Sequence, residues 1–157
     1  MSEARILSEI RDIYADPPDY IFSGPIDDNN ITHWEATING SEDSDSKNGI
    51  FLLYIKIPPD YPYKPPIYKF KTKILHPNIN EESGNICINI LKKDWNPSLT
   101  ISNVLVSIVA LLYNPNFSDP YSGTALTLHK KNDGDKEYKK QIQEWVKRYS
   151  AGEQIKV

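Results

Sequence analysis

The chain has 157 residues, a formal net charge of −3 and a hydrophobic fraction of 39%, with 25% of its residues charged. This length predicts one domain, spanning residues 1–157, with a buried core, and the weak negative charge gives no reason to expect a nucleic acid partner. The single cysteine excludes a disulfide within the chain and favours a reducing compartment, cytoplasmic or nuclear.

The first elements predicted in chain order are one helix and four strands. The helix is indicated by apolar residues at helical spacing, with Glu9 among the polar positions between them, and Asp16-Pro17-Pro18 should end it. Short stretches rich in β-branched and aromatic residues follow at 20–22, 33–38, 50–57 and 67–71, with a turn expected at 23–25. No helix separates these stretches, so neighbours should pair antiparallel as a meander. The apolar helix positions are Ile6, Leu7, Ile10, Ile13 and Tyr14.

The elements predicted after residue 97 are all helical. Ser98-Leu99-Thr100 offers capping residues for a helix over 101–113, which Asn114-Pro115 should end. This stretch is apolar on most faces, which indicates a central helix packed on the sheet, and it is too short to span a bilayer. Two more helices are expected, at about 123–130 and from 133–135 onward. The predicted fold is therefore α+β: an N-terminal helix, a four-stranded antiparallel meander, a central helix packed on the sheet, and two C-terminal helices. The apolar stripe of the last helix comprises Tyr138, Ile142, Trp145, Val146 and Tyr149.

Three further segments carry simpler predictions. Residues 40–49 are acidic and rich in small residues, which is typical of a solvated loop. Residues 58–66 include five prolines, which predicts a stiff connector that packs Tyr61 inward and exposes Tyr63. The first residues contain an early acid and no long apolar run, so neither a signal peptide nor a membrane partner is expected.

The only cysteine, Cys87, lies in a stretch where isoleucine alternates with amide or thiol residues over 85–90. An extended backbone there would turn the isoleucines inward and Cys87 outward, so the thiol is either a nucleophile or an inert, half-buried cysteine. His76 is the nearest candidate base, but Pro77 follows it in a turn, which favours a histidine that hydrogen-bonds to the backbone. A thiol without a strong base suits exchange between thioesters. Asn78 would then act either as an oxyanion donor or as a turn residue that bonds to its own backbone.

These residues carry a family resemblance. His76-Pro77-Asn78, the turn at Gly84, Ile86-Cys87, Ile90-Leu91 and Trp95-Asn96-Pro97 resemble the active-site block of the ubiquitin-conjugating enzymes. The resemblance implies the UBC fold, with ubiquitin carried as a thioester on Cys87 and transferred to a substrate lysine.

The resemblance also assigns roles to neighbours of Cys87. It gives Asn78 a part in transfer, either as oxyanion donor or as organiser of the local loop. Asp119 matches the acidic residue that orients and desolvates the incoming lysine, although a turn or cap before Pro120 would also explain it. His76, Pro77 and Asn89 are implied to be structural, and Asn89 stands where several relatives have an acid.

The partners implied are ubiquitin, a ubiquitin-activating enzyme, a RING-type or other ubiquitin ligase, and a protein substrate. No cofactor or metal is expected, since ATP would belong to the activating enzyme and no residues have zinc-ligand spacing. The protein is expected to act as a monomer, and Phe22 argues against a weak second ubiquitin site on the sheet. The ligase-facing positions implied by the resemblance are Arg5, Pro62, Tyr63, Lys64, Asn96, Pro97 and Ser98.

Three alternatives stay open at this point. The first is the same chemistry on another ubiquitin-like modifier. The second is a non-catalytic binding module of the same fold, which the presence of Cys87 disfavours. The third is a cysteine hydrolase, which the lack of a convincing base disfavours.

Overall fold

The computed structural model describes residues 2–40, 49–116 and 134–149, with no description of the side chains of 134–138. The predicted order of helix, four strands and later helices is confirmed within these residues. The acidic loop from 41 to 48 and the helix predicted at 123–130 lie outside them. The elements are α1 (Ser2–Ala15), β1 (Ile21–Asp27), β2 (Asn30–Asn39), β3 (Ile50–Lys56), β4 (Ile67–Phe70), the 3₁₀ helix η1 (Asn89–Leu91), α2 (Ile101–Tyr113) and α4 (Gly134–Tyr149).

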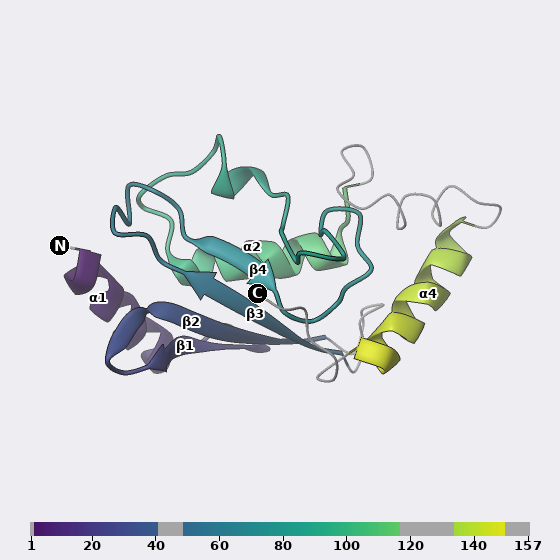
Figure 1. The fold of residues 1–157 in the computed structure, drawn as a ribbon, viewed down its shortest axis with the longest axis horizontal. Coiled ribbons are helices and arrows are strands. Elements are labelled where there is room, and N and C mark those ends of the chain that lie inside the picture. Colours follow the sequence, from purple (N-terminus) through teal and green to yellow (C-terminus); the bar gives the residue numbers. More distant parts are fainter. Residues whose placement is uncertain (1, 41–48, 117–133, 150–157) are drawn as a thin grey trace.

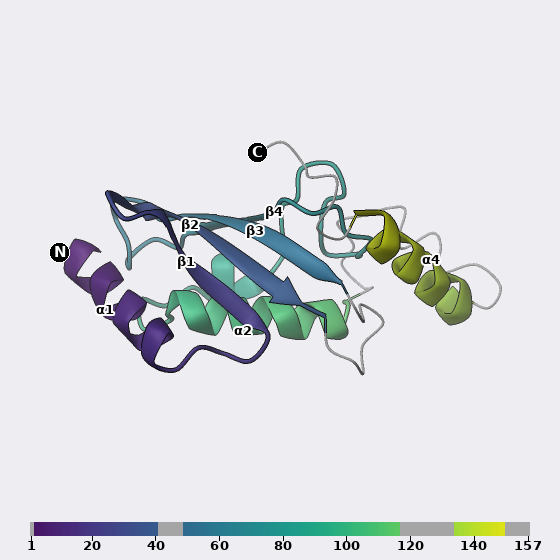
Figure 2. The same ribbon diagram turned by 90° about the horizontal axis from the view of Figure 1, so that it is seen from below.

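The four strands form one antiparallel sheet in the order β1-β2-β3-β4. Alternate side chains of β2 and β3 are buried, as expected for a sheet with one face covered. The figures show α2 running along the sheet, with α1 and α4 at opposite ends of the molecule (Figures 1 and 2). The core lies between the sheet and α2, and its fully buried members include Trp34, Leu53, Ile55, Leu105 and Ile108.

The turn predicted at 23–25 is wrong, because β1 runs straight through these residues. Ser23, Gly24 and Pro25 pair with Ala36, Glu35 and Trp34 of β2. Proline is tolerated here because β1 is an edge strand, where a missing N–H removes no bond to a second neighbour. The register shifts just after Pro25, and the chain reverses at residues 28–29, where the Asn29 N–H donates to the Asp27 carboxylate.

The buried face of α1 also differs from the predicted one. Ile6 and Ile13 are buried as expected, whereas Leu7 and Tyr14 are 40% and 67% exposed. Glu9, predicted among the polar positions, is buried instead. The reason is that Glu9 faces two partners from distant parts of the chain, Tyr61 and Ile101, which a local periodicity cannot anticipate.

Helix α2 begins and ends where the sequence predicts. Thr100 is its N-cap and forms a capping box with Asn103, in which each side chain bonds to the other residue's backbone N–H. Asn114 follows the last helical residue. Among the described residues, no helix is both long and apolar enough to cross a membrane.

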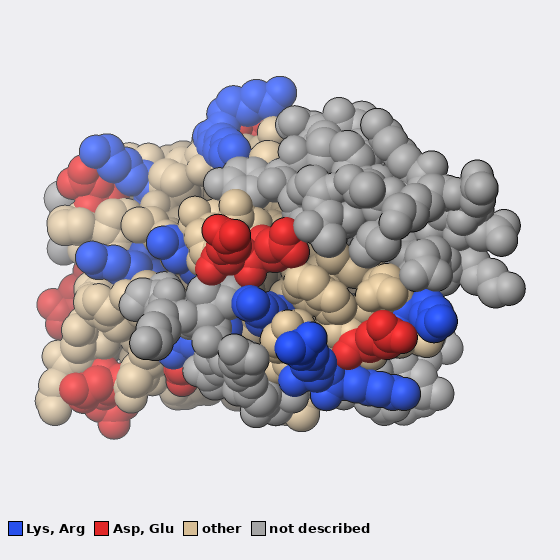
Figure 3. Space-filling model, turned by 45° about the vertical axis from the view of Figure 1, so that its right-hand side comes forward, with Lys and Arg blue, Asp and Glu red and all other residues tan. Residues whose placement is uncertain are grey.

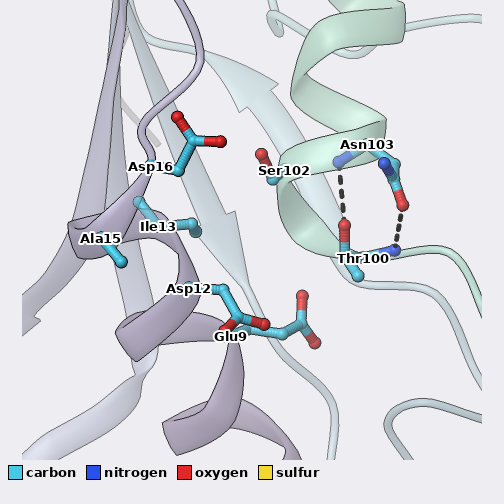
Figure 4. Close-up of a pocket in the computed structure, with 8 residues that line it drawn as sticks. All are labelled: Glu9, Asp12, Ile13, Ala15, Asp16, Thr100, Ser102 and Asn103. Carbon is cyan, nitrogen blue, oxygen red and sulfur yellow. Dashed lines mark hydrogen bonds between the residues drawn. The ribbon is translucent and has the colours of Figure 1, made fainter.

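The Glu9 carboxylate joins α1 to two other segments. It accepts hydrogen bonds from the Ile101 N–H at the start of α2 (2.6 Å) and from the Tyr61 hydroxyl, and it pairs with Arg5 (2.9 Å). Burial and the nearby carboxylate raise the pKa of Tyr61, so its hydroxyl stays protonated and donates. Figure 4 shows Glu9 reaching from α1 toward the capped end of α2, beside the exposed Asp12.

We expect Glu9→Ala to lower the free energy of unfolding by about 3–5 kcal/mol, because it leaves buried donors and Arg5 without their carboxylate. Urea denaturation would measure this as a shift of the midpoint at constant slope. Asp12→Ala, an exposed carboxylate of the same helix, is the matched control and should change stability by about 0.5 kcal/mol or less. Equal effects of the two substitutions would contradict the assigned role of Glu9.

Candidate active site

Gly84 fixes the segment that leads to Cys87 against the edge strand β4. Its carbonyl accepts from the Phe70 N–H (2.9 Å), and isolated bridges join Lys69 to Asn85 and Ile79 to Ile86. Gly84 has φ +77, and a Cβ there would lie 2.0 Å from the Phe70 carbonyl oxygen. Only glycine fits, so this turn holds the Cys87 segment at a defined position beside the sheet.

The Cys87 backbone is hydrogen-bonded to the turn before it, and the Cys87 side chain is half-buried. Its N–H donates to the Asn78 carbonyl oxygen at 2.8 Å. The thiol side chain helps to line a pocket of about 240 Å³. A half-buried sulfur in a pocket is reachable by a partner while its surroundings keep it in place. The other residues of this pocket are Asn78, Ile88, Asn89, Ile90, Leu111 and Asn116.

The extended backbone predicted through residue 90 is wrong in its second half. Ile86 is buried as expected, but the chain turns into the 3₁₀ helix η1 at Asn89, so Ile88 and Ile90 are only partly buried. The Leu91 and Lys92 N–H groups donate to the carbonyls of Ile88 and Asn89 at 3.2 and 2.9 Å. Local 3₁₀ bonds therefore replace sheet pairing immediately after Cys87.

His76 bonds to backbone atoms through both of its ring nitrogens. Nδ1 accepts from the Asn78 N–H (3.0 Å), which requires Nε2 to carry the proton that it donates to the Leu111 carbonyl (2.8 Å). The side chain is buried, and this burial lowers its pKa from 6.5 to about 4, against the opposing effect of the Leu111 bond. A neutral imidazole with both nitrogens bonded to the backbone holds the 76–78 turn against α2.

The low pKa of His76 makes stability depend on pH. Between pH 4 and 6.5 the unfolded chain binds the extra proton and the folded chain does not, so the free energy of unfolding rises with pH across this window. We expect His76 to contribute about 3 kcal/mol above pH 6.5, lost progressively toward pH 4. Urea denaturation at several pH values would show a steeper loss in the wild type than in His76→Gln. Identical slopes for the two proteins would contradict the assignment.

Asn78 joins two loops through its side chain. Its Nδ2 donates to the Asn116 carbonyl and its Oδ1 accepts from the Asn116 N–H, both at 2.8 Å. The side chain is buried and also lines the pocket of Cys87. The arrangement thus ties the segment after α2 to the turn before Cys87, and it places an amide group in the same pocket as the thiol.

The remaining site residues predicted near Cys87 are placed differently. Pro77 is buried between His76 and Asn78, whereas Asn89 is exposed and lines the pocket. Asp119 lies outside the described residues. Sequence reasoning missed Asn116 and Leu111, which lie 38 and 35 residues along the chain from the side chains they bond to, so no local pattern could have indicated them.

The two predicted ligase-facing loops lie together. The Trp95 Nε1–H donates to the Pro62 carbonyl at 3.0 Å, which joins the connector at 58–66 to the loop that precedes α2. Tyr61 is buried and Tyr63 is 76% exposed, so the predicted roles of inward and outward tyrosine are confirmed. Lys64 pairs with Asp60, and Asn96 accepts bonds from Ser98, while Pro97 is exposed.

Arg5 is more occupied than an exposed ligase contact would be. Its guanidinium pairs with Glu9, donates to the Leu99 carbonyl at 3.1 Å and lies 5.4 Å from the centre of the Tyr61 ring. It therefore holds α1 against both loops. Arg5 would therefore support the surface that a partner contacts, through its bonds to Glu9 and Leu99.

Charge is distributed without a dominant sign on the face seen in Figure 3. Basic and acidic side chains are interspersed across the described part of this view. In the described ranges, no three histidine, cysteine, aspartate or glutamate side chains lie close enough together to hold a metal ion. Beside the Cys87 thiol, the described site holds the Asn78 amide in the same pocket and the exposed Lys92, whose Nζ lies 3.7 Å from the Cys87 Sγ.

A thiol held beside a four-stranded meander, with an asparagine in the same pocket, places the molecule among proteins of the UBC fold. The family model described as ubiquitin-conjugating enzyme matches residues 5–146, and the chain belongs to this family. Among solved structures, it is similar to the E2 domain of a Toxoplasma gondii ubiquitin conjugating enzyme. The TM-score is 0.86 at 35% identity, with 96% of this chain and 99% of that one covered.

Proposed function

We propose that the protein accepts ubiquitin from an activating enzyme as a thioester on Cys87 and transfers it to a substrate lysine with the help of a ubiquitin ligase. The observation that supports this most directly is the half-buried Cys87 thiol, which lines a pocket with Asn78 in a chain of the ubiquitin-conjugating family. A reducing compartment, cytoplasmic or nuclear, would keep this thiol available.

The surroundings of Cys87 suit thioester exchange better than peptide hydrolysis. A cysteine hydrolase generally pairs its thiol with a histidine base, but both nitrogens of His76 are bonded to the backbone. Thioester exchange needs no such base, because the incoming acyl group is already activated and sulfur leaves readily. The second step, attack by an amine, develops an oxyanion that an amide donor such as Asn78 would stabilise.

The ligase would bind where the two predicted loops meet. Tyr63 stands out from a connector whose shape is set by prolines, and the bond between Trp95 and Pro62 holds the second loop against it. An exposed aromatic on a pre-ordered loop suits an interface, since little entropy is lost when it binds. Asp119 would complete the site by orienting the incoming lysine.

A charging assay tests the proposal directly. The purified protein would be incubated with activating enzyme, ATP and ubiquitin, then separated with and without thiol reductant. We expect a conjugate that the reductant removes, since thiols cleave a thioester but not an isopeptide or an ordinary ester. Parallel reactions with other ubiquitin-like modifiers and their own activating enzymes would identify the modifier. Failure to charge with any of them would contradict the proposal.

A further inference from the structure

The turn after Cys87 places a positive charge beside the thiol. Five residues of extended chain would carry Lys92 roughly 16 Å from Cys87. The 3₁₀ helix at Asn89–Leu91 shortens this path, and the Lys92 backbone N–H donates to the Asn89 carbonyl at 2.9 Å. As a result the exposed Lys92 ammonium lies 3.7 Å from the Cys87 Sγ, so a substrate that approaches this sulfur also approaches the ammonium.

The charge of Lys92 is not neutralised by an acid in the described part of the chain. Asp94, the acid nearest to it in sequence, is exposed, and within the described residues neither side chain forms an ion pair. The described residues that line the Cys87 pocket are amides and apolar groups, with no charged side chain among them. The charged group in contact with Cys87 in this part of the molecule is thus a cation.

We propose that Lys92 is a specificity-determining residue for the acceptor: it favours substrate lysines with a carboxylate two residues away and disfavours those with a basic residue there. The inference rests on the proposed function, because it concerns transfer from the Cys87 thioester. In that step the neutral acceptor amine attacks the thioester carbonyl carbon, a C–N bond forms and the C–S bond breaks. Sulfur leaves with the electron pair as thiolate, and the amine proton passes to water. Lys92 changes no bond and acts on the charge of the substrate.

The geometry brings a substrate side chain within reach of Lys92. The acceptor amine must come within about 3–3.5 Å of the acyl carbon, which is bonded to the sulfur that Lys92 contacts. Residues two apart in an extended chain lie on the same side of the backbone, roughly 7 Å from each other. The flexible four-carbon stem of Lys92 lets its ammonium move from the sulfur toward a carboxylate at that distance. A basic side chain in the same place would meet a like charge.

Single-turnover transfer to short peptides tests the inference. The thioester is purified from the activating enzyme and mixed with acetyl-Xaa-Gly-Lys-Gly-Xaa-amide, in which Xaa is glutamate, glutamine or arginine. Modified peptide is measured with time, and the glutamine peptide is the uncharged reference. An exposed ion pair changes an equilibrium about 1.4- to 5-fold, so at low ionic strength we expect the glutamate peptide to react about 3- to 10-fold faster than the arginine peptide.

Three substitutions locate the selectivity. Lys92→Gln should reduce the ratio of glutamate to arginine peptide rates to about 1.5 or less, whereas Lys92→Arg keeps the charge and should keep the ratio. Lys93→Gln is the matched control. Lys93 is equally exposed, but within the described residues no bond to Cys87 is found for it, so its removal should preserve the ratio. Raising the ionic strength to about 1 M, where the screening length is about 3 Å, should bring the wild-type ratio close to 1.

The outcomes separate the inference from the proposed function. A wild-type ratio near 1, a ratio that high salt leaves unchanged, or equal loss of the ratio in Lys93→Gln would overturn the inference alone. The same holds if Lys92→Gln slows all three peptides alike, because a purely structural role changes every rate and no ratio. In each of these cases the thioester still forms and discharges, so the proposed function stands. A complete absence of thioester would overturn the proposed function, and the inference with it.

Discussion

Replacing Cys87 by serine is expected to abolish the conjugate that thiol reductant removes. The chain contains no other cysteine, so no second thiol can accept the modifier. A serine hydroxyl is a weak nucleophile without an adjacent base, and the candidate base His76 has both ring nitrogens bonded to the backbone. Any ester that forms slowly on the serine would resist reductant. The expected result on a non-reducing gel is therefore complete loss of the reductant-sensitive band.

Alkali distinguishes the two kinds of reductant-resistant product. An ester on the serine of Cys87→Ser would be cleaved by mild base, whereas an isopeptide on a lysine would survive it. The substitution exchanges one small half-buried group for another, so stability should change by less than about 1 kcal/mol. A reductant-sensitive conjugate that persists in Cys87→Ser, in a folded protein, would show that the thioester is not on this residue.

Local patterns predicted the fold well wherever neighbours in sequence determine the structure. The β-branched and aromatic residues of 50–57 indicated β3, and Thr100 and Asn114 indicated the two ends of α2. The turn expected at 23–25 failed because Ser-Gly-Pro is favourable for a turn, yet the pairing of these residues with β2 outweighs that local preference. The conformation of residues 23–25 is set by their pairing with β2, which their own sequence does not indicate.

The same limit applies to buried polar groups. The sequence of residues 2–15 predicts that Glu9 is a surface residue of an amphipathic helix. Its partners Tyr61 and Ile101 lie 52 and 92 residues away, so no pattern within this helix indicates them. A carboxylate buried at such a junction can be inferred only when the segments that supply its donors have been placed.

At the candidate site, the residue types in the sequence identified the functional residues but did not predict their arrangement in space. The lone thiol and the His-Pro-Asn turn pointed to Cys87, His76 and Asn78. The contact of Lys92 with the thiol could not be predicted, because it depends on a 3₁₀ turn that interrupts the alternation of residues 85–90. That alternation extended through residue 90 would have placed Lys92 far from the sulfur.

Asn78→Ala is expected to slow transfer to free lysine by about 10²–10³-fold while leaving charging at nearly the wild-type rate. Charging exchanges one thioester for another. Attack by a neutral amine instead gives a zwitterionic intermediate that readily expels the amine again, so transfer depends more on stabilising the oxyanion until the proton is lost and the thiolate leaves. Single-turnover discharge of the purified thioester onto lysine would measure the second step separately from the first.

The hydrogen bonds of Asn78 to Asn116 introduce a competing explanation, which a second substitution resolves. Asn78→Asp keeps an acceptor for the Asn116 N–H but removes the amide donor, so it preserves one of the two bonds between the loops. If the donor acts on the oxyanion, Asn78→Asp should transfer as slowly as Asn78→Ala. If the residue only organises the loops, Asn78→Asp should slow charging as well as transfer, because its second carboxylate oxygen would face the Asn116 carbonyl that Nδ2 now bonds to. Equal loss of charging and transfer in both variants would contradict a role specific to transfer, because only damage to the Cys87 pocket as a whole affects the two steps alike.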